Sequence, residues 1–322
     1  MNSTQKVSWY IVLGTSYRVL LGTLYIYLLY FPSLLIRSPM NKIGFNVLAW
    51  SAEISEALFP ILDRLKGIGY DGAEFFIGDT DQKTCRLVGD YCKKIGLEVT
   101  AVTVMGAAEN PISSDPAVRE KAKEKLKWVL DRAADLGAQV LCGPFHSAFA
   151  TFASRAPISE EYDWSAEVLQ EVGDYAQSLG ILLTPEALNR FECYLANTME
   201  QLDYLLSKVQ HPNVQAMFDT HHANMEEKKL GLAIERIAPR LGHVHISEND
   251  RGTPGSGHVN FDETFAALKK VGYTGWLTIE GFTRNDPAFA NAIGVWREFS
   301  APWEMAEQGY QLIKGMCEKH GM

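Results

Sequence analysis

The chain has 322 residues, of which 47% are hydrophobic and 21% charged, as in an ordinary globular protein with a sizeable core. Its formal net charge is −9 at pH 7, from 30 basic and 39 acidic residues. An acidic surface does not neutralise phosphates, so the composition argues against a nucleic-acid-binding protein and is compatible with a small neutral substrate.

The first 39 residues differ from the rest of the chain. They contain three basic residues and no acidic one, so the remaining chain carries a net charge of −12. Residues 19–36 form an apolar run close to the length of roughly 20 residues that a membrane helix needs. We interpret residues 1–39 as an apolar N-terminal extension. It is either a membrane or signal segment or a stretch upstream of a true start at Met40. Membrane association is expected only if this extension belongs to the natural protein.

The five cysteines are odd in number, and no two of them have the spacing of a metal-ligand pair. We interpret them as reduced, structural thiols in a reducing compartment. The sequence therefore predicts a cytoplasmic protein, unless residues 19–36 anchor it to a membrane.

From residue 40 onward, short apolar runs alternate with stretches of helical periodicity. Helix starts are indicated by residue types that cap helices, namely Ser55, Asp115, Thr198 and Asp262. The expected strands cover residues 42–49, 72–76, 97–104, 139–143, 181–186, 214–219, 242–246 and 276–280. The expected helices cover residues 55–65, 81–94, 115–136, 162–179, 198–208, 230–237, 262–270 and 302–319.

This alternation predicts the fold class. Near-continuous apolar strands that alternate with helices indicate a parallel sheet covered by helices. Eight such units predict an α/β protein, a (β/α)₈ TIM barrel, which typically takes about 250 residues, as a single domain over residues 40–322. The alternative is an open doubly wound sheet, but no Gly-x-Gly-x-x-Gly follows the first strand.

Four ionisable residues stand at the ends of the last four expected strands: Glu186, Asp219, His245 and Glu280. Strand ends of a barrel converge on one face, so these side chains should meet there. Singly, an acid at a strand end is more often a helix cap or an ion-pair partner, and a lone histidine is more often part of the core. Clustered carboxylates repel one another, and a divalent cation removes that cost. Three carboxylates and an imidazole favour Mn²⁺, with Co²⁺ or Mg²⁺ as alternatives, over a structural zinc site.

The residues around these positions resemble the D-tagatose 3-epimerase / D-psicose (allulose) 3-epimerase family of xylose-isomerase-like sugar isomerases and epimerases. The similarity runs from Met40 to the C-terminus. It is carried by the Glu-x5-Glu, Asp-x2-His and His-x5-Arg spacings within LTPEALNRFE (183–192), MFDTHHANMEE (217–227), HVHISENDR (243–251) and TIEGF (278–282).

The resemblance implies specific roles. Glu186, Asp219, His245 and Glu280 would hold one divalent metal ion, and Glu186 and Glu280 would also be the catalytic acid/base pair. Glu192, His222 and Arg251 would bind the C1–C3 oxygens of a ketose. The implied activity is C3 epimerisation of free 2-ketoses through a cis-enediolate, in a homodimer or homotetramer. Removal of a proton from one face and its return to the other require two bases, which agrees with a pair of carboxylates.

The sequence also departs from the family. Gly281 stands where proline is usual, His221 where phenylalanine is common, and residues 44–50 and 105–110 differ, so substrate identity stays open. Glu74 and His146 are expected to line or support the pocket rather than to bind metal. The glycine-rich stretch 252–257 lacks the order of a phosphate-binding loop. The alternatives are a hydroxypyruvate isomerase, an inosose dehydratase, a three-zinc apurinic-endonuclease-like barrel, which the acidic surface disfavours, and a sugar-binding barrel without turnover.

Overall fold

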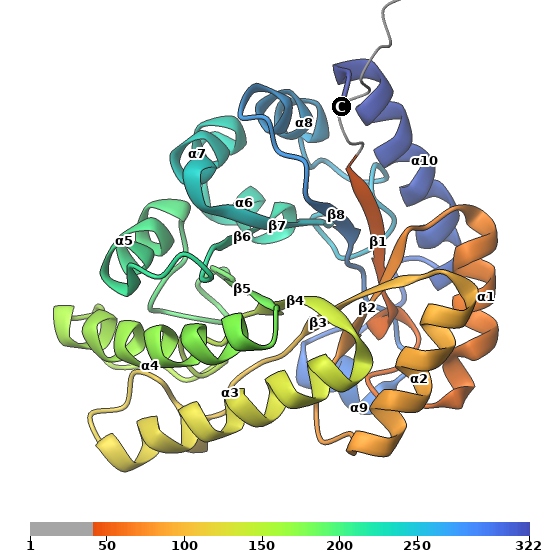
Figure 1. The fold of residues 1–322 in the computed structure, drawn as a ribbon. Coiled ribbons are helices and arrows are strands. Elements are labelled where there is room, and N and C mark those ends of the chain that lie inside the picture. Colours follow the sequence, from red (N-terminus) through yellow and green to blue (C-terminus); the bar gives the residue numbers. More distant parts are fainter. Residues whose placement is uncertain (1–40) are drawn as a thin grey trace, which may run out of the picture. The chain divides into compact units, whose positions relative to one another are not determined.

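The computed structural model describes residues 41–322, in which eight parallel strands form a closed barrel ringed by helices (Figure 1). The expected extension over residues 1–39 lies outside the described residues. The strands are β1 (Lys42–Asn46), β2 (Gly72–Phe76), β3 (Glu98–Val102), β4 (Ala138–Gly143), β5 (Leu182–Pro185), β6 (Ala216–Asp219), β7 (Leu241–Ile246) and β8 (Trp276–Ile279). The predicted (β/α)₈ barrel is confirmed.

Strand pairing follows the chain, in the order β5-β4-β3-β2-β1-β8-β7-β6, and every pair is parallel. Two isolated bridges, Leu183 with Val214 and Glu186 with Met217, join β5 to β6 and close the ring. The β1 strand pairs with both β2 and β8, so the first and last units of the domain depend on each other.

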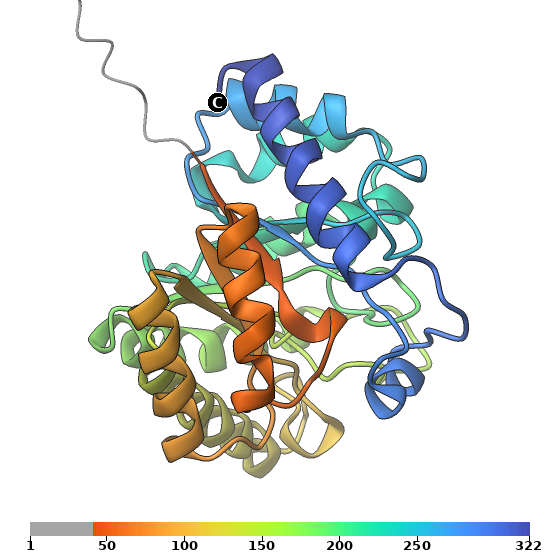
Figure 2. The same ribbon diagram turned by 90° about the vertical axis from the view of Figure 1, so that its right-hand side faces the viewer.

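The helices lie outside the strands and bury one face each against them. Helix α3 shows the spacing that produces this packing, with Leu126, Val129, Leu130 and Ala133 fully buried. On the side drawn in Figure 2, α1 and α10 run next to each other, and Arg64 of α1 forms a 2.7 Å ion pair with Glu307 of α10. The helices are α1 (Phe59–Ile68), α2 (Gln82–Ile95), α3 (Pro116–Leu136), α4 (Ser159–Ser178), α5 (Met199–Val209), α6 (Thr220–Glu226), α7 (Leu230–Ile237), α8 (Phe261–Lys270), α9 (Pro287–Ala292) and α10 (Pro302–His320).

Local capping explains where several predicted boundaries hold and where they fail. Asp115 and Thr198 accept backbone N–H bonds and cap α3 and α5 as expected. The prediction for Ser55 is wrong, because its side chain makes no capping bond and a 3₁₀ turn (Glu56–Leu58) precedes α1. The prediction for Asp262 is also wrong, because Asn260 caps α8 by accepting from Glu263.

Two short helices were not predicted, and both lie near the strand ends. Helix α6 starts directly after β6, and Asp219 is its cap. Helix α9 is capped by Asp286 and has proline in its first turn. The first strand also ends early, at Asn46, because residues Val47–Ala49 turn into a 3₁₀ helix. Among the helices within residues 41–322, none is long and apolar enough to cross a membrane.

Gly143 links the barrel to the site above it. Its φ is 120°, a backbone conformation that side chains rarely adopt, and an added Cβ would lie far inside contact distance of the Thr103 carbonyl oxygen. Its own carbonyl accepts a 2.9 Å hydrogen bond from the backbone N–H of Glu186. A residue larger than glycine would therefore displace the start of the loop that follows β5.

We expect Gly143→Ala to be destabilising in two ways: about 1–3 kcal/mol from backbone strain and a further ~1–3 kcal/mol from overpacking. Gly137→Ala is the matched control, because Gly137 also has a positive φ, 83°, but an added Cβ would meet no atom within 4 Å. That control should cost only about 1 kcal/mol. Urea unfolding of the two variants measures the difference, and equal costs would contradict the packing argument.

Candidate active site

The four residues that end the last four strands meet at the C-terminal end of the barrel. Glu186 follows β5, Asp219 ends β6, His245 lies in β7 and Glu280 follows β8. Each offers one ligand atom, and these four atoms all lie within 4.8 Å of one another. All four residues are buried. The structure therefore brings together the complete set that the strand-end pattern selected.

The two carboxylate oxygens of Asp219 have different partners: one caps a helix and the other contacts residues of the site. Its Oδ1 caps α6 by accepting from the backbone N–H of His221 at 2.6 Å. Its Oδ2 accepts from Ser247 Oγ at 3.1 Å and from Arg251 Nη1 at 2.9 Å. The helix start that sequence analysis missed thus fixes the orientation of this carboxylate.

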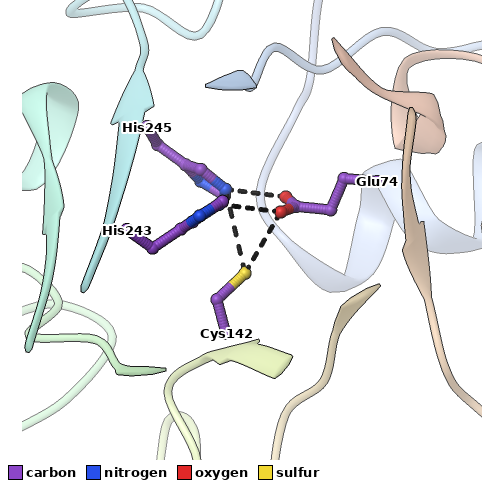
Figure 3. Close-up of side chains that lie close together, drawn as sticks. All are labelled: Glu74, Cys142, His243 and His245. Atoms are coloured by element: carbon purple, nitrogen blue, oxygen red, sulfur yellow. Dashed lines mark hydrogen bonds and ion pairs between the residues drawn. The ribbon is translucent and has the colours of Figure 1, made fainter. Parts of the chain in front are cut away.

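His245 stands between two groups of acids. Its Nε2 lies 2.6 Å from Glu74 Oε1, at the base of the site (Figure 3). Its Nδ1 faces the other side, 3.6 Å from Asp219 Oδ2 and 3.4 Å from Glu280 Oε2, and has no hydrogen-bond partner. Burial alone would lower the pKa of His245, but the carboxylates of Glu74 and Glu280 raise it well above its ordinary value.

The acids of the site differ in their proton affinity. Burial, together with repulsion from Asp219 and Glu280, raises the pKa of Glu186 well above its ordinary value. Burial would raise the pKa of Asp219 as well, but the guanidinium of Arg251 and the nearby histidines hold it well below its usual range. In the metal-free protein one carboxyl of the set therefore favours its protonated form, while its neighbour stays ionised.

The residues present fit a divalent cation. Glu186 Oε1 and His245 Nδ1 are both buried without a hydrogen-bond partner, and both belong to the four-residue cluster. Unpartnered buried polar atoms are costly, and a cation among them would satisfy both. An oxygen-rich set with one imidazole is suited to Mn²⁺ or Mg²⁺.

The three residues expected to bind substrate oxygens lie next to this cluster. Arg251 Nη1 is 2.8 Å from Glu280 Oε2, and its Nη2 is 2.8 Å from His222 Nε2. His222 Nδ1 accepts from the backbone N–H of Asn189 at 3.1 Å, and Glu192 Oε1 accepts from the Asn189 side chain at 2.8 Å. Burial and the adjacent guanidinium lower the pKa of His222 well below its ordinary value, so its ring is neutral.

One cavity of about 800 Å³ contains these groups. Glu186, Glu192, His222, Arg251 and Glu280 line its polar side. The rest of the wall is mainly apolar and includes Leu48, Phe76, Val102, Val104, Phe149, Phe282, Phe289, Ile293, Val295 and Phe299. The cavity thus offers polar groups to a small polar molecule within a mainly apolar wall.

The regions that depart from the family pattern contribute unequally to this cavity. Leu48, in the first of these regions, lines the cavity. Residues 105–110 do not line it, because the part of the wall that follows β3 ends at Val104. His221 lines it too, and burial, then the charge of Arg251, lowers its pKa to about 4. At Gly281, an added Cβ would lie 2.5 Å from Met305 Sδ and 2.9 Å from the Arg251 carbonyl oxygen, so this packing requires glycine.

The glycine-rich stretch after β7 encloses a carboxylate rather than an open anion site. Glu248 is fully buried, and its two oxygens accept from the backbone N–H groups of Asn249, Gly255 and Val259 at 2.8–3.0 Å. These donors would be needed to hold a phosphate. The structure therefore explains why this stretch is not a phosphate-binding loop: its backbone N–H groups already donate to Glu248.

Sequence reasoning missed Asn46 and Asn189, which hold the site residues in place. Asn189 contacts both His222 and Glu192. Asn46 donates to Glu74 Oε1 at 3.1 Å and to Glu280 Oε1 at 3.0 Å. Asn46 ends β1 as Asp219 ends β6, but the sequence prediction extended this strand to residue 49, so the strand-end rule could not have selected Asn46. Of the two expected supporting residues, Glu74 lies beneath the site, and His146 Nε2 contacts the Glu186 carbonyl oxygen at 2.8 Å.

Comparisons with known proteins agree with this architecture. Residues 62–321 match the family model described as xylose isomerase-like TIM barrel. An L-ribulose 3-epimerase of Methylomonas sp. is 34% identical over 84% of this chain and 96% of its own length. A D-psicose 3-epimerase of Agrobacterium fabrum is 30% identical over 83% of this chain and 93% of its own length. The crystal structure of a D-allulose 3-epimerase from Methylomonas sp. in complex with D-allulose superposes with a TM-score of 0.81 at 30% identity, covering 87% of this chain and 98% of that one.

We expect Mn²⁺ to stabilise the metal-free protein, because it would relieve repulsion among Glu186, Asp219 and Glu280. At a Mn²⁺ concentration roughly 100 times the Kd, the gain is about 2.7 kcal/mol. Metal affinity should rise with pH, since a cation competes with the proton that the raised pKa of Glu186 retains. Calorimetric melting with and without Mn²⁺ measures the gain. The gain should disappear in Asp219→Asn, and its persistence there would place the cation elsewhere.

Proposed function

Because this chain belongs to the ketose 3-epimerase family of xylose isomerase-like TIM barrels, we propose that it is a metal-dependent epimerase that interconverts the C3 epimers of free 2-ketoses. The observation that carries the proposal is the pair of buried carboxylates, Glu186 and Glu280, that share one cavity with Arg251 and His222. The substrate pairs we propose are D-tagatose with D-sorbose and D-fructose with D-psicose.

The reaction needs two proton carriers. The C3 hydrogen of a 2-ketose is acidic only because C2 is a carbonyl, and its removal gives a cis-enediolate. A bound divalent cation supplies positive charge that polarises the carbonyl and favours the enediolate. One of Glu186 and Glu280 takes the proton from C3, and the other returns a proton to the opposite face. Glu186 and Glu280 are both buried and both line the cavity, which supports their assignment as this pair.

The remaining polar groups orient the ketose. Arg251 is buried and presents guanidinium N–H donors at the cavity wall, where they can bind substrate oxygens. His222 is neutral, so it lies at the cavity wall without adding charge beside Arg251. Glu192 accepts a hydrogen bond from Asn189 and can accept another from a sugar hydroxyl. We propose that these three residues bind the C1–C3 oxygens.

For the cation, the cellular location and the oligomeric state, we propose what the sequence predicted. The cation is one Mn²⁺ per chain, with Co²⁺ or Mg²⁺ as substitutes, and the protein acts in the cytoplasm as a homodimer or homotetramer. An extension over residues 1–39 would add membrane association if it is part of the natural protein. Hydroxypyruvate isomerase, inosose dehydratase and turnover-free sugar binding remain the alternatives that the experiments below separate.

Proton exchange tests the chemistry. In D₂O with Mn²⁺ and a ketose, the wild-type protein should place deuterium at C3, because each turnover passes through the enediolate. Glu280→Gln should lower epimerisation roughly 10²–10⁴-fold by removing one proton carrier. Mass spectrometry and NMR of the recovered sugar measure both effects, with the metal content of the variant checked first.

Glu192→Gln serves as the matched control, because it removes a charge from the same cavity without removing a proton carrier. It should weaken ketose binding while deuterium still enters C3 at saturating substrate. Full turnover in metal-loaded Glu280→Gln would contradict the role of Glu280, and a sugar-binding protein would show no exchange at all.

A substrate panel tests the class of sugar. D-Fructose, D-psicose, D-tagatose and L-ribulose should each be epimerised at C3, at different rates, because the polar groups can bind the C1–C3 part that these ketoses share and the rest of the cavity wall is mainly apolar. Chromatography of the products after exchange into Mn²⁺ measures the rates. Activity on hydroxypyruvate alone, or dehydration of an inosose, would replace the proposed reaction by the corresponding alternative.

A further inference from the structure

We propose that Glu74 is a positioning residue that keeps His245 in the tautomer with the proton on Nε2 and, through Asn46, holds Glu280 in place. Glu74 lies in β2, on the opposite side of His245 from the cavity residues, and does not line the cavity. The inference rests on the proposed metal-dependent function, because its consequence is a pre-arranged set of metal ligands.

Every contact of the Glu74 carboxylate is with a group that can donate a hydrogen. Oε1 lies 2.6 Å from His245 Nε2 and 3.1 Å from Asn46 Nδ2. Oε2 lies 2.9 Å from His243 Nε2, 2.9 Å from Thr100 Oγ1 and 3.3 Å from Cys142 Sγ. Figure 3 shows the two imidazoles and the thiol directed at this one carboxylate. An ionised carboxylate only accepts hydrogen bonds, so each of these partners must donate.

This requirement determines the state of His245. Metal binding at Nδ1 would require this nitrogen to be without a proton, and the one proton that remains on the neutral ring is then on Nε2, where it is donated to Glu74. Nδ1 would offer its lone pair to the cation, and it is the atom that faces Asp219 and Glu280. Histidine ligands of metals are commonly fixed in this way by a hydrogen bond from the other ring nitrogen to a carboxylate.

The second connection runs through Asn46. Its side-chain amide donates to Glu74 Oε1 and to Glu280 Oε1, which leaves Glu280 Oε2 directed at Arg251 and His245. Glu74 therefore contacts one candidate metal ligand directly and a second through one amide. A single buried carboxylate in β2 orients groups that arise from β7 and β8.

The same four side chains, Glu74, Cys142, His243 and His245, could instead be considered a second cation site, since their ligand atoms lie within 4.8 Å of one another. The contact distances favour hydrogen bonding. Both histidine Nε2 atoms lie within 3 Å of a Glu74 oxygen, where an N–H donor fits. A cation at the centre would require both Nε2 atoms to be bare, and His245 would then have to serve two cations. The hydrogen-bond network therefore predicts one cation per chain.

Titration calorimetry of the metal-free protein with Mn²⁺ tests the inference without any substrate. We expect one cation per wild-type chain and a Kd for Glu74→Gln that is about 10–100-fold weaker. Glutamine retains one acceptor oxygen but faces the second histidine with an N–H group, so His243 or His245 must change its tautomer. Epimerisation by this variant should recover in part as Mn²⁺ is raised towards saturation.

Thr100→Val is the matched control, because it removes a hydrogen bond to Glu74 Oε2 and leaves the contact between Oε1 and His245. Its loss of affinity should stay below that of Glu74→Gln. Equal losses in the two variants, an unchanged Kd in Glu74→Gln, or two cations per wild-type chain would each overturn the inference.

A measurement on the wild-type protein covers the case in which Glu74→Gln does not fold. With diamagnetic Mg²⁺ bound, ¹⁵N NMR of the histidine side chains should place the His245 proton on Nε2, and a proton on Nδ1 would refute the tautomer assignment.

The outcomes of these experiments distinguish the role of Glu74 from the proposed epimerase function. Weakened Mn²⁺ binding in Glu74→Gln without ketose turnover by the wild type would refute the epimerase function alone. Turnover by the wild type with unchanged affinity in the variant would refute only the role of Glu74.

Discussion

The concentration of buried negative charge at one end of the barrel is the constraint on which the site depends. Glu74, Glu186, Asp219 and Glu280 are all buried, and unpaired buried carboxylates are expensive. Arg251 neutralises part of this charge through Asp219 and Glu280, and the histidines add donors. Glu186 keeps an oxygen without a partner, so the protein part of the site is incomplete and a cation is the natural complement.

The barrel topology explains how these buried carboxylates come to lie close together. Parallel strands deliver their C-terminal ends to one face, so residues far apart in the chain become neighbours without any irregular connection between them. The contacts at the base of the site join β1, β2, β3, β4 and β7 through Asn46, Glu74, Thr100, Cys142 and His243. The half of the barrel that supplies no candidate metal ligand thus holds the ligands of the other half in position.

Strands and connecting segments both contribute to the cavity. On its polar side, Glu186 and Glu280 directly follow strands, whereas Glu192, His222 and Arg251 lie in the segments after them. The apolar wall combines residues that end β2 and β3 with connecting segments such as the one that contains α9. Loops vary more freely than strands, so we expect the strand-end cluster to depend on the barrel and the rest of the wall to vary with the connecting segments.

The sequence by itself determined the strand–helix alternation, the barrel class and the four strand-end residues, because strand periodicity and strand ends are local properties of the chain. The sequence did not predict α6, because Asp219 was interpreted only as a site residue and not also as the cap of this helix. It also gave the wrong starts for α1 and α8. Only the tertiary structure decided that Asn189 holds His222 and Glu192, and that Glu74 and Asn46 lie under His245 and Glu280. These contacts join residues up to 234 positions apart, and their formation depends on side-chain directions that are fixed only when the ring of strands closes.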